Sequence, residues 1–464
     1  MSSDLLEWFQ RHSWLDGCDL AVERQQARDE GRELASVESD FQRLLDTERD
    51  EAWFAAAGAL MDRVQMLPCR ADNADREPSD LPGIKSERPT APALKAWRGS
   101  RREWQRRLHG GLLGRICGCM LGKPVEGWPR ASIRITGEET GNWPPTNYWR
   151  QPTAREAKRI AGRQPRRTLN DRQTNWLRDG LSGMVEDDDI NYTTSGFAIL
   201  KRYGADFRPM DVASFWGDNL PVFHTCSAER AAYRNFASGI LPPASATHRN
   251  PYREWIGAQI RADYFGYSNP GNPERAAEWA WRDASISHIK NGIYGEMWAA
   301  AMLAAAYVAN DWETIIRAGL AQIPAHCRLR EDIEKILRAH DAGASYDDTI
   351  QLVRAQWDEM NVHHWCHTNS NAQIVAVGLL WGEDDYEKTI TRAVMPGFDT
   401  DCNGATCGSL WGVRHGVDQL PRKWTRPMHD LVRTGVAGYH EVKISNLAEE
   451  MVHVALQAAP ARHR

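Results

Sequence analysis

The alanine-rich segment at residues 291–311, NGIYGEMWAAAMLAAAYVAND, constrains the fold more than any other part of the chain. Alanine has the highest helix propensity of the amino acids. The segment is also apolar on nearly every side, which is typical of a helix in the interior of a protein. It therefore predicts a buried helix and argues against a sheet in this region.

Helical patterns continue along most of the chain. Residues 38–67 combine strong helix formers with apolar residues at helical spacing, and residues 371–382 predict a further buried helix. In residues 445–459, Leu447, Met451, Val454 and Ala455 repeat at i, i+4, i+7 and i+8, which is one face of a helix. Strict alternation of β-branched residues is almost absent. We therefore predict an all-α fold, a compact multi-helix bundle.

The length of 464 residues allows about three domains, or one large domain with an appendage, at roughly 150 residues per domain. A proline-rich, charged segment at residues 74–93 indicates a linker or a surface strap. We predict a helical N-terminal extension with this linker over residues 1–95 and a main domain over 96–464. Residues 144–175 are polar and arginine-rich, which fits either a solvated insertion or a mobile lid that meets an anionic substrate.

Composition excludes several classes of protein. The net charge of -5 offers no basic excess for a phosphate backbone, so we expect no nucleic-acid partner. No apolar run reaches about 18 residues and the N-terminus has no signal pattern, so we expect no membrane association. The nine cysteines are odd in number and scattered, which indicates reduced thiols and a cytoplasmic location. The oligomeric state is left open.

Two groups of carboxylates stand out. Glu186 to Asp189 form an acidic run with apolar flanks, and Asp399 and Asp401 lie one residue apart in GFDTDC. Each group could simply begin a helix, because carboxylates cap the free N–H groups of a first turn. Together they would form an oxygen-rich cage for one or two divalent ions. Oxygen ligands alone favour Mg²⁺ or Mn²⁺ over Zn²⁺.

Glycines occur at positions 110, 114, 118 and 122, a spacing of four that leaves one face of a helix without side chains. We predict close packing of another helix on this face. The helix should end near Pro124, which places Glu126 on a loop that could reach a site. A separate group, His363 to His367, allows a zinc site, although its spacing matches no usual zinc motif.

These features together resemble the ADP-ribosylglycohydrolase family, from about Leu108 to about Val417. The family's Gly-Asp-x-x-Gly-x-Pro-x-Glu pattern is similar to GCMLGKPVEG, with Glu126 in place. Its Thr-Asp-Asp-Thr motif falls on residues 187–190, its Ser/Thr-His pair on residues 287–288, and its Gly-x-Asp-Thr-Asp-Thr motif on GFDTDC. The resemblance implies an all-α fold with two Mg²⁺ or Mn²⁺ ions and hydrolysis of a glycosidic bond at the anomeric carbon of an ADP-ribosyl group, on a protein or on a small ribosyl-containing substrate.

The resemblance also implies roles for individual residues. The catalytic residues would be Glu126, Asp188 and Asp401. The metal ligands would be Asp187, Asp188, Asp189, Asp399, Asp401 and Cys402. Substrate phosphate would meet a helix N-terminus and its neighbours, namely Ser287, His288, Asn291, Gly292 and Gly295.

The chain departs from the family pattern at several positions. Cys119 stands where the family has Asp, Asp187 and Ile190 replace two threonines, and Cys402 replaces a hydroxyl. A thiol is a poor ligand for Mg²⁺, so these positions bear on the number of ions and on the substrate. Three alternatives therefore stay open: a hydrolase of another N-riboside, such as a nucleoside or nucleotide metabolite, a non-catalytic binding protein on the same fold, and a zinc hydrolase built on His363 to His367.

Overall fold

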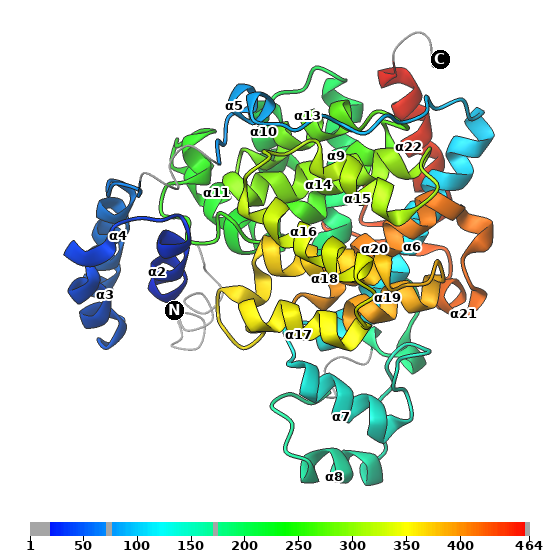
Figure 1. Cartoon of the computed structure of the whole chain (residues 1–464), viewed down its shortest axis with the longest axis horizontal. Helices are drawn as coiled ribbons and strands as arrows, with labels where there is room; N and C mark the ends of the chain where they lie inside the picture. Colours follow the sequence, from blue (N-terminus) through cyan, green and yellow to red (C-terminus); the bar gives the residue numbers. More distant parts are fainter. Residues whose placement is uncertain (1–18, 71–76, 170–174, 460–464) are drawn as a thin grey trace.

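The computed structural model describes residues 19–70, 77–169 and 175–459. It confirms the all-α prediction, since helices pack on helices throughout and the described residues contain one two-stranded hairpin (Figure 1). The α-helices are α2 (Leu20–Asp29), α3 (Glu38–Leu45), α4 (Glu51–Gln65), α5 (Leu81–Ser86), α6 (Arg101–Gly122), α7 (Arg130–Thr140), α8 (Ala154–Gly162), α9 (Asp188–Tyr203), α10 (Pro209–Asn219), α11 (Ser227–Ala237), α12 (Asp263–Tyr267), α13 (Pro273–Ala284), α14 (Lys290–Ala306), α15 (Trp312–Leu320), α16 (Arg328–Asp341), α17 (Tyr346–Gln356), α18 (Thr368–Leu380), α19 (Tyr386–Val394), α20 (Thr400–His415), α21 (Arg422–Thr425) and α22 (Ile444–Ala458). The strands are β1 (Leu431–Arg433) and β2 (Glu441–Lys443), which pair antiparallel.

The alanine-rich segment forms α14, and this helix is buried from Asn291 to Ala306. Small alanine side chains let neighbouring helices approach it on all sides, and α12, α13 and α15 pack against it. None of the described helices combines the length and the apolar character needed to cross a bilayer.

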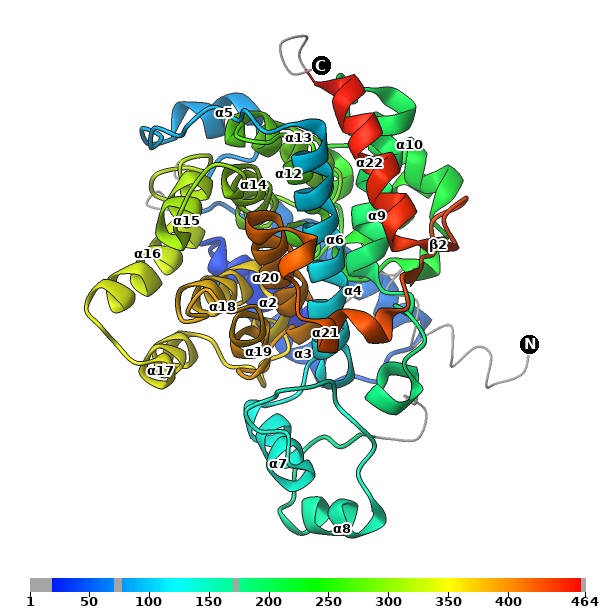
Figure 2. The same ribbon diagram turned by 90° about the vertical axis from the view of Figure 1, so that its right-hand side faces the viewer.

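Helices α6 and α20 pack with their backbones in contact, and Figure 2 shows them side by side at the centre of the molecule. The contact uses the predicted glycine face of α6 and a second glycine stripe on α20. A Cβ at Gly114 would lie 2.3 Å from the Gly408 carbonyl oxygen, and a Cβ at Gly118 would lie 2.0 Å from that of Gly404. Only glycine fits such distances. The antiparallel pairing brings the C-terminal end of α6 beside the N-terminal end of α20.

Helices α2, α3 and α4 form a lobe at the left of Figure 1 with its own apolar core. The lobe is joined to the main body by buried charges. Arg253 of the main body binds Glu23, which lies in α2, and Glu30, which caps the C-terminal end of α2. All three side chains are at most 1% exposed. Glu254 accepts a hydrogen bond from Gln26 at 2.7 Å.

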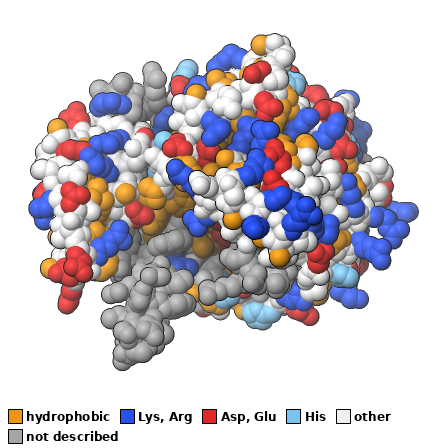
Figure 3. Space-filling model, turned by 90° about the horizontal axis from the view of Figure 1, so that it is seen from below, with side chains coloured by type: hydrophobic (Ala, Val, Ile, Leu, Met, Phe, Trp, Pro, Cys, Tyr) orange, Lys and Arg blue, Asp and Glu red, His pale blue; other side chains and the backbone are white. Residues whose placement is uncertain are grey.

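The arginine-rich insertion contains α8, which projects from the main body together with α7 (Figure 1). Three of its arginines pair with nearby acids: Arg159 and Arg163 bind Glu139, and Arg150 binds Glu156. In the view from below, Lys and Arg side chains are interspersed with Asp and Glu (Figure 3). This pairing favours the solvated insertion over an arginine lid; residues 170–174 lie outside the described part.

Candidate metal centre

A cleft of about 290 Å³ opens where the ends of α6, α9 and α20 meet. Six carboxylates line it, and four of them, from Glu126, Asp188, Asp399 and Asp401, are predicted site residues from three distant parts of the sequence. Glu186 and Glu229 contribute the other two carboxylates. Its other lining side chains include Lys123, His224, Cys226, Trp255, Trp365 and Cys402.

The first acidic run begins α9. Asp187 caps the helix, because its Oδ1 accepts a hydrogen bond from the Asp189 N–H at 2.9 Å, and its Oδ2 pairs with the Lys123 ammonium. Asp189 is fully buried and its Oδ1 lies 2.6 Å from Arg115 Nη2. Asp188 lies between them in sequence and lines the cleft. The three aspartates therefore have different roles: two are held by cations and one is open.

The second acidic pair begins α20. A left-handed turn at Gly397 and Phe398, with φ of 86° and 64°, ends the preceding segment and places Asp399 at the cap of the helix. The Cys366 thiol donates to Asp399 Oδ2 at 3.5 Å, while Oδ1 is buried and no described side chain or backbone group donates to it. Asp401 Oδ1 accepts a hydrogen bond from the backbone N–H of Cys402 at 3.1 Å.

The close approach of these carboxylates changes their acidity. Burial, followed by the charges of Asp187 and Asp401, raises the pKa of Asp188 to about 8. Burial also raises the pKa of Asp399 well above its usual range, with Asp401 as the next cause. Burial acts on Asp187 in the same direction, but the Lys123 ammonium outweighs it and lowers the pKa of that carboxyl. Such a site favours cation binding, since a cation stabilises the charged forms.

Glu126 follows the 3₁₀ turn Lys123–Val125 that continues α6. Its side chain is exposed and lines the cleft. Desolvation by the surrounding protein, followed by the charge of Asp401, raises the pKa of Glu126 well above its usual range. Glu126 thus faces the same cleft as the acidic pair of α20.

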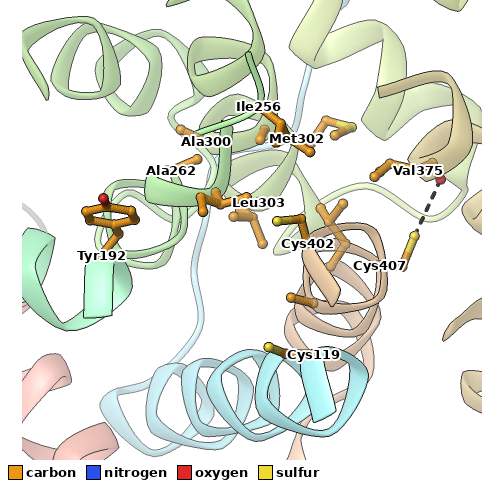
Figure 4. Close-up of a cluster of buried hydrophobic side chains, with 14 of the residues drawn as sticks. Cys119, Tyr192, Ile256, Ala262, Ala300, Met302, Leu303, Val375, Cys402 and Cys407 are labelled. Atoms are coloured by element: carbon orange, nitrogen blue, oxygen red, sulfur yellow. Dashed lines mark hydrogen bonds between the residues drawn. The ribbon is translucent and has the colours of Figure 1, made fainter. Parts of the chain in front are cut away.

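The residues present fit a hard divalent cation. Ligand atoms of Asp399, Asp401 and Cys402 lie within 4.8 Å of one another, as do those of Cys119, Asp187, Asp189 and Asp401. The unpartnered, buried Asp399 Oδ1 needs a donor or a cation. Carboxylate oxygens suit Mg²⁺ or Mn²⁺, whereas the two thiols are soft and add little for these ions. Cys119 projects from α6 and Cys402 from α20, beside the same cluster of apolar side chains (Figure 4).

The predicted phosphate contacts lie elsewhere. None of Ser287, His288, Asn291, Gly292 and Gly295 lines the acidic cleft. Ser287 Oγ accepts from Arg261 at 2.9 Å and bonds His288 Nδ1 at 2.8 Å, and Asn291 donates to Glu77 and Glu254. A Cβ at Gly292 would lie 2.7 Å from the Arg253 carbonyl oxygen, and one at Gly295 would lie 2.4 Å from Thr368. These residues make packing and hydrogen-bonding contacts, and His288 lines a separate pocket, so their role in phosphate binding stays a prediction.

The histidine cluster does not support zinc. His363 and His367 lie near Asp29 of α2, but His363 Nδ1 accepts from the Trp255 indole at 3.0 Å and His367 Nδ1 accepts from the Asn369 N–H at 3.0 Å. Each neutral ring therefore carries its proton on Nε2, and neither ring offers a free lone pair. His363 Nε2 lies 3.3 Å from Asp29 Oδ2, so this group anchors α2 to the main body.

Several residues of the centre were missed by the sequence analysis. Arg115 and Lys123 neutralise two aspartates, and Trp255 and Trp365 form an aromatic wall with ring centroids 5.8 Å apart. The spacing of four at Gly404, Gly408 and Gly412 was available as a signal, since it repeats the spacing of the recognised glycines on α6. No local pattern marks the two cations or the two tryptophans.

Comparison with known proteins places this geometry in a family. No curated protein matches the chain. One solved structure, described as an ADP-ribosylglycohydrolase-related protein complex, is 18% identical with a TM-score of 0.45, and the alignment covers 76% of this chain and 99% of that chain. The model of the family described as ADP-ribosylglycohydrolase matches residues 100–460, which includes every carboxylate of the cleft. The chain therefore belongs to the ADP-ribosylglycohydrolase family.

Proposed function

We propose that the protein is a metal-dependent hydrolase that cleaves the glycosidic bond at the anomeric carbon of an ADP-ribosyl group, on a protein or a small molecule. Membership of the family supports glycoside hydrolysis in general. The observation that carries the proposal is the convergence of Glu126, Asp188, Asp399 and Asp401 on one cleft, with a buried carboxylate oxygen that lacks a donor.

The residues have separate tasks in this proposal. Asp188, Asp399 and Asp401 would hold Mg²⁺ or Mn²⁺. When bound, the metal supplies Lewis-acid polarisation of a water molecule and of the ribose hydroxyls. Glu126 accepts the proton of the attacking water at its carboxylate, from the open side of the cleft. The negative charge of Asp188, Asp399 and Asp401 also stabilises the oxocarbenium-like transition state of the ribosyl group as the leaving group departs.

The aromatic wall gives the substrate its orientation. Trp255 and Trp365 lie edge to face at 74° on one side of the cleft, and Trp255 is fixed by its hydrogen bond to His363. A flat ring of the substrate can stack on an exposed indole face. The wall would therefore hold the base or the leaving group while the carboxylates act on the ribose.

A smaller riboside is the second candidate substrate. The cleft volume of about 290 Å³ lies just below the range of roughly 300–1,000 Å³ for small-molecule sites. This size favours a nucleoside or nucleotide metabolite over a complete ADP-ribosyl group, unless the diphosphate extends outside the cleft.

A substrate panel tests both candidates. Chelated protein is incubated with ADP-ribosylated arginine, ADP-ribosylated serine and small N-ribosides, with and without added Mn²⁺, and the released ADP-ribose or ribose is measured. Release from the ADP-ribosyl conjugates supports the first candidate, and release only from small ribosides supports the second. No release with any substrate would favour a binding protein on this fold.

The variant Glu126→Gln tests the assigned proton acceptor. We expect a loss of about 10²–10⁴-fold in rate with unchanged metal affinity. Glu186→Gln is the matched control, because Glu186 lies at the same cleft but its carboxylate already bonds His224 and Asn191. Equal rates for Glu126→Gln and the wild type would remove Glu126 from the mechanism.

A further inference from the structure

The acidic centre already contains two cations of its own. The Lys123 ammonium pairs with Asp187, and Arg115 lies 2.6 Å from Asp189. The side chains are 12% exposed for Lys123 and 0% for Arg115, so both ion pairs are shielded from water. The two cations come from one face of α6 and the turn that continues it.

The carboxylates on the other side of the centre have no such partners. Within the described ranges, no Lys, Arg or His nitrogen lies within 4.0 Å of the carboxylates of Asp188, Asp399 or Asp401. Asp399 Oδ1 is buried without a hydrogen-bond donor. These three aspartates therefore carry negative charge that no side-chain cation of the described residues balances.

We propose that this centre binds one divalent ion, at the group formed by Asp399 and Asp401 with Asp188 lining the same cleft, and that the Lys123 ammonium takes the place of a second ion. This inference rests on the proposed function and specifies its metal site. An ion bound among Asp187, Asp189 and Asp401 would meet the positive charge of Lys123 at close range. Each of the two ligand groups contains one soft thiol, Cys119 or Cys402, so the Lys123 ammonium is the feature that disfavours an ion in this group.

Lys123 is held in this position from two sides. Its ammonium contacts Asp187, and it lies 4.9 Å from the centroid of the Trp176 ring, which is a cation–π contact. A second ion would have to displace the ammonium from both partners. The fixed ammonium thus keeps Asp187 neutralised without a metal ion.

Metal stoichiometry tests the proposal independently of activity. Chelated full-length protein is titrated with Mn²⁺ by calorimetry, and the bound ions are examined by electron paramagnetic resonance. We expect one ion per wild-type chain with the six-line signal of an isolated Mn²⁺. In Lys123→Met, combined with Cys119→Asp to supply a hard ligand, we expect two ions and the broadened signal of a coupled pair.

The control is Lys201→Met. Lys201 lies on α9, the helix that Asp188 begins, and pairs with Glu450 of α22, so this variant should still bind one ion. Lys123→Gln serves as a second uncharged variant if Lys123→Met does not fold. Two coupled ions in the wild type would overturn this inference and leave the proposed hydrolase intact. A single ion in the double variant would also overturn it. Binding of no Mn²⁺ by any variant would refute the metal-dependent function itself.

Discussion

The buried ion pairs between α2 and the main body allow a quantitative test of how the N-terminal lobe is held. Arg253 Nη1 lies 2.6 Å from Glu23 Oε2, and its Nε binds Glu30. Glu30 also binds Arg32, but among the described residues Glu23 has no other ion-pair partner. Replacing Arg253 with methionine keeps most of the side-chain volume and leaves the Glu23 carboxylate buried without its cation.

The expected cost follows from this geometry. Removing one partner of a buried ion pair destabilises a protein by about 3–5 kcal/mol, because the remaining charge is left uncompensated. The entropy of unfolding is about 2.1 cal/mol/K per residue, so the total for a chain of 464 residues is roughly 1 kcal/mol/K. Arg253→Met should therefore lower the melting temperature by about 3–5 °C if the lobe and the main body unfold together.

Differential scanning calorimetry measures this shift, and a separate early transition would show that the lobe detaches first. Arg24→Met is the control, because Arg24 of α2 pairs with Glu38 near the surface and such pairs contribute about 0–1 kcal/mol. Adding Glu23→Gln to Arg253→Met removes the stranded charge and should restore part of the loss. A melting temperature for Arg253→Met within 1 °C of wild type would refute the reasoning.

Three further predictions follow from other contacts. Burial raises the pKa of Glu30, but Arg253, Lys290 and Arg32 together outweigh burial and hold that pKa below 4.5. The stabilisation is therefore complete above pH 4.5 and is lost as the pH falls below it. The difference in melting temperature between the wild type and Glu30→Gln should therefore shrink in acid. Gly408→Ala places a Cβ 2.2 Å from a carbonyl oxygen of α6 and should lower the free energy of unfolding, measured in urea, by about 1–3 kcal/mol or more. Gly162→Ala is the control and should leave it unchanged, because no atom lies within 4 Å of the added Cβ. Mn²⁺ should raise the melting temperature of the wild type, and Asp401→Asn should abolish most of this rise; an equal rise in both would exclude Asp401 as a ligand.

The helices were predictable because their signals are local. The alanine-rich segment became α14, and the stripe at residues 445–459 became α22. The glycine face of α6 was predicted to pack closely on another helix, and the structure confirms this contact. The partner helix could not be identified, because glycine spacing specifies close approach but not which of many helices approaches.

The sequence by itself determined the all-α class, the two acidic groups and the loop position of Glu126, since each depends on residue types within one or two helical turns. Only the tertiary structure decided which aspartates remain open. The register of α6 along α20, fixed by backbone contact at glycines such as Gly118 and Gly404, aligns the end of one helix with the start of the other. That alignment places the Lys123 ammonium beside Asp187 and leaves Asp399 Oδ1 without a hydrogen-bond donor among the described residues. Charge pairing depends on distances between segments remote in sequence, and those distances exist only after the helices have packed.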